Sequence, residues 1–218
     1  MSKQILFLLE QNADEQQADK MSAYMQNRFV FAGVPKPKLK ELIKPYLAKT
    51  AKEQLDWQFV FELWDSEYRE AQYVALEYLQ KHHKQLKPSD LDHLKRLITT
   101  KSWWETVDTI DAFVGEILLQ DTNLKDEILK WAVDENLWLR RTAIDCQQKY
   151  KEKTDQELLE RVIVANLNSE EFFINKAIGW SLRDYGKVNP DWVREFVERH
   201  REQMASLSIK EATKLIEQ

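Results

Sequence analysis

Turn-forming residues are scarce in this sequence, because its 218 residues include only four glycines and five prolines. Sheet-rich folds need such residues between successive strands, so the count excludes an all-β sandwich or barrel. Apolar residues instead recur at spacings of three and four, as in Leu91, Leu94, Leu97 and Ile98. This spacing gives a helix one apolar face. The sequence therefore predicts an all-α protein of roughly a dozen helices, each of about 10–16 residues.

Short polar patterns mark several helix starts. Four segments match the capping box, in which a hydroxyl residue is followed three positions later by glutamate; they begin at Thr50, Ser102, Thr154 and Ser208. Asn189 is followed by a proline, which is the order favoured where a helix begins. Pro35 and Pro88 open further segments in the same way. We expect a helix to start at each of these seven positions.

Length and composition narrow the architecture further. A chain of 218 residues that is 43% hydrophobic and 11% aromatic can bury a sizeable core without metal or disulfide staples. Short helices with short connections favour a curved solenoid of stacked antiparallel helix pairs, as in HEAT-like repeats. We expect residues 1–218 to form a single domain of this kind. Because the repeat is weak in the sequence, a compact helical bundle remains the alternative.

The net charge of −5 argues against a nucleic-acid partner, because duplex affinity comes largely from lysine and arginine on phosphates. The charge is unevenly distributed, however. Between Gly33 and Lys52 there are six lysines and a single acid, Glu41. A local basic patch inside an acidic protein is therefore predicted.

Cysteine and histidine indicate neither a disulfide nor a metal site. Cys146 is the only cysteine, so no intrachain disulfide forms, and this fits a reducing compartment. We expect it to be a small buried hydrophobic residue. The histidines lack the spacing of a ligand set. No apolar segment reaches transmembrane length, and we expect a cytoplasmic protein.

Three segments combine tryptophan with charged residues at helical spacing. The pairs are Trp104 with Asp108, Trp138 with Arg141, and Trp180 with Lys176 and Arg183. In each segment the side chains share one helix face, where an indole and a carboxylate can stabilise a cation and an arginine can bind a phosphate. A structural alternative stays open for each: tryptophans in the core and charged residues at the surface.

Two further positions are ambiguous on spacing alone. Gly179, inside the third segment, permits the close approach of either a neighbouring helix or a bulky ligand. Tyr24 lies one turn before Arg28 and ahead of the lysine-rich stretch. It suits either contact with a nucleic-acid backbone or packing.

Taken together, the segments KSWWETVD (residues 101–108), NLWLRRTAI (136–144) and EFFINKAIGWSLR (171–183) resemble the AlkD-type DNA alkylation repair family. These are bacterial DNA glycosylases built from HEAT-like repeats, and the resemblance runs over essentially the whole chain. It implies that Asp108 is the catalytic carboxylate, that Trp104 and Trp180 flank the lesion, and that Arg141 is the family's key arginine. The family's N-terminal helical tyrosine matches Tyr24, which places the chain with the active branch.

The resemblance implies hydrolysis of the N-glycosidic bond of cationic N3- and N7-alkylated purines, such as 3-methyladenine and 7-methylguanine, in duplex DNA. This is the first step of base excision repair by a monofunctional glycosylase. Such a protein needs no cofactor, no metal and no membrane. We expect a monomer that associates with the nucleoid when it acts on DNA. The residues expected to hold the DNA backbone are Tyr24, Arg183, Lys176, Lys36, Lys38 and Lys40.

A cationic base is already a good leaving group, so a single acid without a general-acid partner predicts activity on cationic lesions only. The acidic net charge keeps two alternatives open. One is a non-catalytic HEAT-repeat binder of DNA structures, and the other is a helical scaffold for protein partners.

Overall fold

The computed structural model describes residues 1–216, which contain thirteen α-helices, four short 3-10 helices and no strand apart from one isolated bridge between Val30 and Tyr68. The chain divides into two compact units, of which the first is Met1–Leu86 and the second begins at Lys87.

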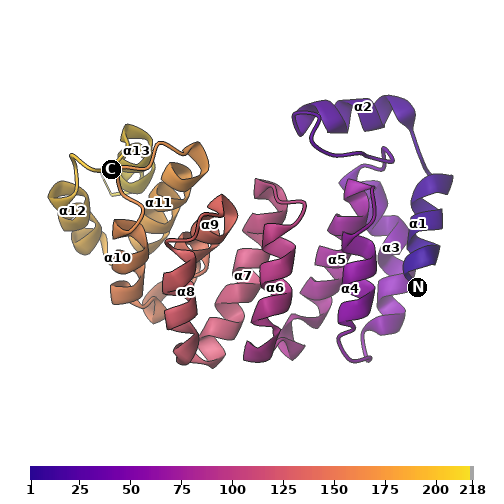
Figure 1. Ribbon diagram of the computed structural model, residues 1–218, viewed down its shortest axis with the longest axis horizontal. Coiled ribbons are helices and arrows are strands. Elements are labelled where there is room, and N and C mark those ends of the chain that lie inside the picture. Colours follow the sequence, from indigo (N-terminus) through magenta and orange to yellow (C-terminus); the bar gives the residue numbers. More distant parts are fainter. Residues whose placement is uncertain (217–218) are drawn as a thin grey trace. The chain divides into compact units, whose positions relative to one another are not determined.

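The first unit contains five α-helices. They are α1 (Ser2–Gln11), α2 (Glu15–Tyr24), α3 (Lys36–Thr50), α4 (Trp57–Trp64) and α5 (Arg69–His82), followed by the 3-10 turn η1 (His83–Gln85). Helix α5 packs against α1, α3 and α4 and is the most buried of the five. Helix α2 runs across the other helices rather than along them (Figure 1), and none of its residues is buried. Its position therefore depends on the loop that follows it.

A fully buried carboxylate holds that loop. Glu70, near the start of α5, accepts hydrogen bonds from the backbone amides of Ala32, Gly33 and Val34 at 3.0, 2.8 and 3.0 Å. Gly33 has a φ of +90°, and a Cβ there would lie 2.0 Å from the Asp14 carbonyl oxygen. The loop therefore passes close to the start of α2, and Glu70 fixes the segment between Tyr24 and the lysines of α3.

We expect Glu70→Gln to lower the free energy of unfolding by about 1–3 kcal/mol, because the new amide group leaves a buried backbone N–H without an acceptor. Urea denaturation measures the change. Glu67→Gln, at an exposed position just before α5, is the matched control and should have little effect. Equal stability of the two variants would contradict the role of Glu70.

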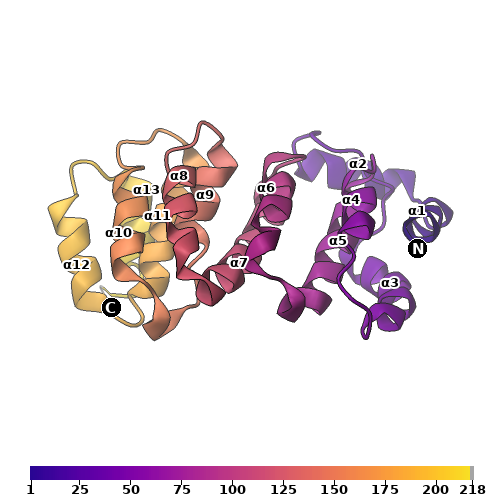
Figure 2. The same cartoon turned by 60° about the horizontal axis from the view of Figure 1, so that its bottom comes forward.

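The second unit is a stack of helix pairs. Its α-helices are α6 (Leu91–Thr99), α7 (Trp104–Gln120), α8 (Lys125–Trp131), α9 (Leu137–Asp145), α10 (Gln156–Val164), α11 (Phe172–Tyr185), α12 (Pro190–Arg199) and α13 (Ser206–Thr213), with 3-10 turns η2 (Pro88–Asp90), η3 (Thr122–Leu124) and η4 (Lys151–Lys153). Helices α7, α9, α11 and α13 pack side by side in one layer, while α8 and α10 pack together in another (Figures 1 and 2).

This arrangement confirms the predicted all-α fold of stacked antiparallel helix pairs. In the second unit the second helix of each pair contacts the second helix of the next, which is the pattern of HEAT-like repeats rather than of a bundle around one shared core. The layer formed by α7, α9 and α11 carries all three tryptophan segments of the sequence.

The expected helix starts are mostly wrong. Thr50 is the last residue of α3, Ser102 precedes α7 by two residues, Ser208 lies inside α13, and Asp155 rather than Thr154 caps α10. The starts marked by proline are confirmed: Pro35 directly precedes α3, and Pro88 is the first residue of η2. At the start of α12 the Asn189 side chain accepts from the Trp192 amide.

The hydroxyl groups explain most of these errors. Ser102 donates to the Ile98 carbonyl of the preceding helix at 2.6 Å, and Ser208 donates to the Asn175 carbonyl of α11 at 2.8 Å. A hydroxyl group satisfies its hydrogen bond equally well at a helix start, on its own backbone or across a helix interface. The local pattern does not distinguish these partners.

Gly179 permits the close packing of α11 on α13. A Cβ at this position would lie 2.5 Å from the Glu211 Cβ and 3.0 Å from the Ser208 carbonyl oxygen. Of the two possibilities left open by the sequence, the neighbouring helix is therefore the one observed.

We expect Gly179→Ala to destabilise the protein by about 1–3 kcal/mol, although alanine favours helices, because α11 and α13 must move apart. Thermal unfolding measures the loss. Gly186→Ala is the control, since a Cβ there has no neighbour closer than 3.2 Å. If the Gly179 variant is as stable as the Gly186 variant, α11 and α13 move apart without a measurable loss of stability.

Candidate active site on α7, α9 and α11

An ion pair between α7 and α9 lies at the centre of the site. Arg141 donates from Nε to Asp108 Oδ1 at 2.8 Å and from Nη2 to Asp108 Oδ2 at 2.9 Å. The arginine side chain is 1% exposed, whereas that of Asp108 is 24% exposed. Such a bidentate pair fixes both groups. The carboxylate is therefore the part of the pair that a ligand can reach.

Local structure holds the guanidinium of Arg141 in place. Asn136 caps α9 by accepting from the Trp138 and Leu139 amides at 2.9 and 3.3 Å. The remaining guanidinium nitrogen, Nη1, donates to the carbonyl of Phe173 on α11 at 2.7 Å. The arginine thus connects three helices of one layer, and its orientation is set by protein contacts alone.

The surface interpretation of Arg141 is wrong. Although Arg141 is three residues from Trp138, the two side chains have different contacts. Trp138 packs against Trp103 and Phe173, with ring centroids 5.7 and 5.0 Å away. Trp103 in turn packs on Phe173 at 5.3 Å. These rings form an apolar cluster, while Arg141 points to the carboxylates.

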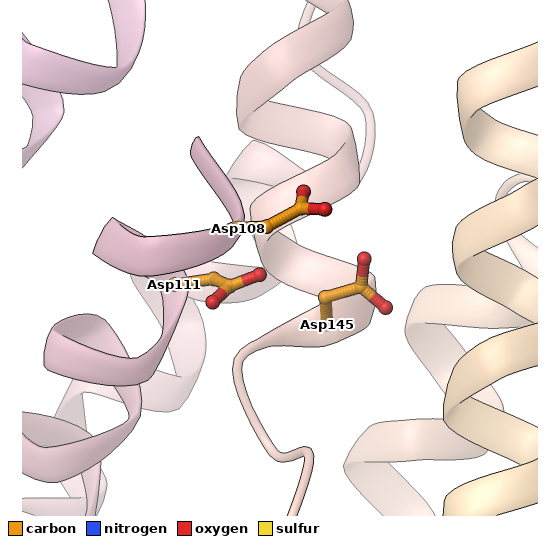
Figure 3. Close-up of side chains that lie close together, drawn as sticks. All are labelled: Asp108, Asp111 and Asp145. Carbon is orange, nitrogen blue, oxygen red and sulfur yellow. The ribbon is translucent and has the colours of Figure 1, made fainter. Parts of the chain in front are cut away.

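Two further carboxylates join Asp108, and neither was predicted from the sequence. Asp111 lies one turn after Asp108 on α7, and Asp145 lies one turn after Arg141 at the end of α9 (Figure 3). One carboxylate oxygen from each of the three residues lies within 4.8 Å of the others. Spacings of three and four residues were the available signal, but only the packing of α7 on α9 brings the two pairs together.

Burial and mutual repulsion change the acidity of the two added carboxyl groups. Burial, followed by the negative charges of Asp145 and Asp108, raises the pKa of Asp111 well above its usual value. Burial also raises the pKa of Asp145, to about 6, although Arg141 opposes this. The neutral form of Asp111 is therefore favoured relative to an ordinary aspartate, and Asp145 changes charge near pH 6.

The three carboxyl groups match the oxygen ligands of a hard cation, although no metal was expected from the sequence. The guanidinium of Arg141 already supplies a positive charge to this cluster. It bonds to Asp108, and its Nη2 lies 3.6 Å from Asp145 Oδ2. The arrangement is that of carboxylates sharing an arginine.

The two tryptophans proposed to flank the lesion have different surroundings. Trp180, on α11, has the Arg141 guanidinium and the Lys176 ammonium each 5.4 Å from its ring centroid. Trp104 is the first residue of α7, one turn before Asp108, and is partly exposed. An indole and an accessible carboxylate thus lie on adjacent turns of one helix.

The two basic residues of α11 share an acidic partner. Lys176 and Arg183 each form an ion pair of 2.6 Å with Glu211 of α13. The hydrogen bond from Lys176 is the main reason that the pKa of Glu211 is lowered. The group of Lys176, Trp180 and Arg183 predicted from the sequence therefore has a carboxylate bound to both of its cations. The spacing of residues along α11 does not reveal this carboxylate, because it belongs to α13.

The other predicted DNA-contact residues belong to the first unit. Tyr24, the last residue of α2, is 72% exposed. Lys36 and Lys38 lie in the first turn of α3 and are exposed, and the Lys36 ammonium is 4.5 Å from the Tyr73 ring centroid. Lys40 pairs with Glu77 at 2.8 Å. Tyr24 thus does not pack in the core.

The structure confirms the structural interpretation of the single cysteine. Cys146 is buried, and burial raises the pKa of its thiol far above its usual value, so it is an unreactive thiol. Among residues 1–216, no helix combines the length and the apolar character needed to cross a bilayer.

Comparisons with known proteins identify the family and the fold. The family model described as DNA alkylation repair enzyme matches residues 5–216. A solved structure from Enterococcus faecalis, described as a predicted DNA alkylation repair enzyme, is 34% identical, with 94% of this chain and 96% of that chain covered and a TM-score of 0.85. No curated protein matches this chain.

Two more distant structures, both from Streptococcus mutans, share the fold at 17% identity. AlkD2 has a TM-score of 0.58 over 79% of this chain and 98% of its own, and smu.31 has 0.59 over 83% and 98%. The extent of the family match and the similarity to the Enterococcus faecalis structure show that this chain belongs to the DNA alkylation repair enzyme family.

Proposed function

We propose that this protein is a monofunctional DNA glycosylase that hydrolyses the N-glycosidic bond of cationic N3- and N7-alkylated purines in duplex DNA. The observation that carries the proposal is the accessible Asp108 carboxylate, fixed by a buried arginine and one turn from Trp104. Expected substrates are 3-methyladenine and 7-methylguanine, which are released as the first step of base excision repair.

The site is suited to stabilising positive charge. As the glycosidic bond breaks, the sugar becomes cationic, and a preorganised carboxylate with adjacent indole faces lowers the energy of that state. The alkylated base leaves without protonation, so no general acid is needed. Asp108 also orients the attacking water in this mechanism. Arg141 holds the carboxylate in position through two hydrogen bonds.

DNA binding is assigned to residues outside this carboxylate cluster. Contacts to the phosphate backbone are offered by the exposed Tyr24 and by the lysines at positions 36, 38 and 40. Lys176 and Arg183, which pair with Glu211, add further contacts when a phosphate shares these cations with the carboxylate. We further propose a cytoplasmic monomer. Its DNA affinity should fall steeply as salt increases, because the contacts are electrostatic.

The test is incubation of the protein with methylated duplex DNA and quantification of free 7-methylguanine and 3-methyladenine. Release above the rate of spontaneous loss supports the proposal, and a duplex containing uracil should remain intact because its leaving base is neutral. Salt-dependent binding without release favours a non-catalytic binder of DNA structures. Absence of binding at low salt favours a scaffold for protein partners.

A further inference from the structure

The ion pair between Asp108 and Arg141 poses an electrostatic problem. A carboxylate bonded through both oxygens to a guanidinium is a neutral unit. The charge of Asp108 is therefore largely offset at short range, and the pair by itself attracts a cation only weakly. A site that stabilises a cationic sugar needs an additional negative charge close by.

Asp145 has the geometry to supply this charge. Its Oδ2 lies 3.6 Å from Arg141 Nη2, is buried, and accepts no hydrogen bond from the described residues. Its Oδ1 is held by the Ser181 hydroxyl at 2.8 Å and the Gln148 amide at 2.6 Å. Two hydrogen bonds thus hold the carboxylate with Oδ2 toward the guanidinium.

On this basis we propose that Asp145 is a positioning residue that acts through Arg141: it shares the guanidinium charge, so that Asp108 keeps a net negative charge toward the cationic sugar. The inference rests on the proposed glycosylase function. Asp145 touches no substrate in this scheme. It changes the charge of the cluster from zero, when it is protonated, to minus one, when it is ionised.

The groups around Asp145 determine whether its ionisation alone changes the charge of the cluster. Asp108 and Asp111 face it from α7, and Arg141 and the Cys146 thiol face it from its own helix. Helix α11 presents the Ser181 hydroxyl.

The charge count follows from these surroundings. The buried residues of α6, α8 and α10, which also pack on α9, are all apolar. The pKa of Asp111 is raised well above its usual value, first by burial, which favours its neutral form, and burial also raises the pKa of the Cys146 thiol. Asp108 and Arg141 cancel, so the ionisation of Asp145 decides the net charge.

The experiment is a pH series of single-turnover release of 7-methylguanine between pH 5 and 8, corrected for spontaneous loss. The wild-type rate should fall below about pH 6, where Asp145 takes up a proton. Asp145→Asn should release the base about 10-fold more slowly at pH 7.5 and should lack this acid limb. Asp191→Asn, at an exposed acid of α12 that pairs with Arg194, is the control, and its rate at pH 7.5 should stay within about two-fold of wild type.

A second variant keeps the inference testable if Asp145→Asn does not fold. The Ser181 hydroxyl lowers the pKa of Asp145, so Ser181→Ala should move the acid limb to higher pH. If the wild-type enzyme has an acid limb and neither variant alters it, the role of Asp145 is overturned and the proposed function stands. A wild-type protein that releases no base overturns the proposed function itself, and with it the role of Asp145.

Discussion

Asp108→Asn should lower the single-turnover rate of alkylpurine release by about 100–1,000-fold, the usual cost of losing one preorganised electrostatic contact to a transition state. The substitution preserves the shape of the side chain but removes the accessible charge. It also leaves the buried Arg141 facing an amide, so the cluster becomes less suited to a cation. Affinity for undamaged duplex should stay within about two-fold, because Asp108 is not a phosphate contact.

Both quantities are measurable on one preparation, release by chromatography of the free base and affinity by fluorescence anisotropy. Asp191→Asn is a suitable control, since Asp191 is exposed on α12 and pairs only with the nearby Arg194 among the described residues. Undiminished release by the Asp108 variant would remove this residue from the mechanism.

Arg141→Leu should destabilise the protein by about 3–5 kcal/mol at pH 7, which is typical when one partner of a buried ion pair is removed. Asp108 and Asp145 would lose their shared cation, and the Phe173 carbonyl would lose its donor. The side-chain volume is partly replaced, so the loss is mainly electrostatic.

The destabilisation should depend on pH in a defined direction. Arg141 opposes the raised pKa values of Asp111 and Asp145, so its removal raises those values further in the folded protein. A group with a raised folded-state pKa stabilises the protein at low pH and loses that stabilisation as pH rises through the folded pKa. The gap between wild type and Arg141→Leu should therefore widen from pH 5 to pH 8.

Urea unfolding at several pH values measures this gap. Arg194→Leu, at an exposed arginine of α12, should show a small gap that does not change with pH. A large loss of stability that is the same at pH 5 and pH 8 would indicate a packing defect rather than unshared buried charge.

Much of the fold follows from short-range patterns. Apolar spacing of three and four residues along α6 corresponds to its buried Leu91, Leu94, Leu97 and Ile98. The Asn189 cap was also predictable, because asparagine is a preferred N-cap and proline suits the first position of a helix. The capping boxes failed because a serine such as Ser102 or Ser208 finds its partner on another element, which a four-residue pattern does not contain.

The candidate site was predictable only in part. Resemblance to a family pointed to Asp108 and Arg141, but spacing alone favoured a surface arginine, and the structure buries it. Glu211 was placed in a capping box, whereas it binds Lys176 and Arg183 of α11. Long side chains that reach across helices are the ones that spacing within a single helix predicts least well.

The amino-acid sequence by itself determined the helical content, the single buried thiol and the tryptophan segments, since each depends on residues within about one or two helical turns. The tertiary structure alone decided that Asp108 and Arg141, 33 residues apart, form one ion pair and that Asp111 and Asp145 surround it. The physical reason is that burial and neighbouring charge set the ionisation of a carboxyl group. Both are properties of how α7 and α9 pack, and neither is encoded in the spacing of residues along one helix.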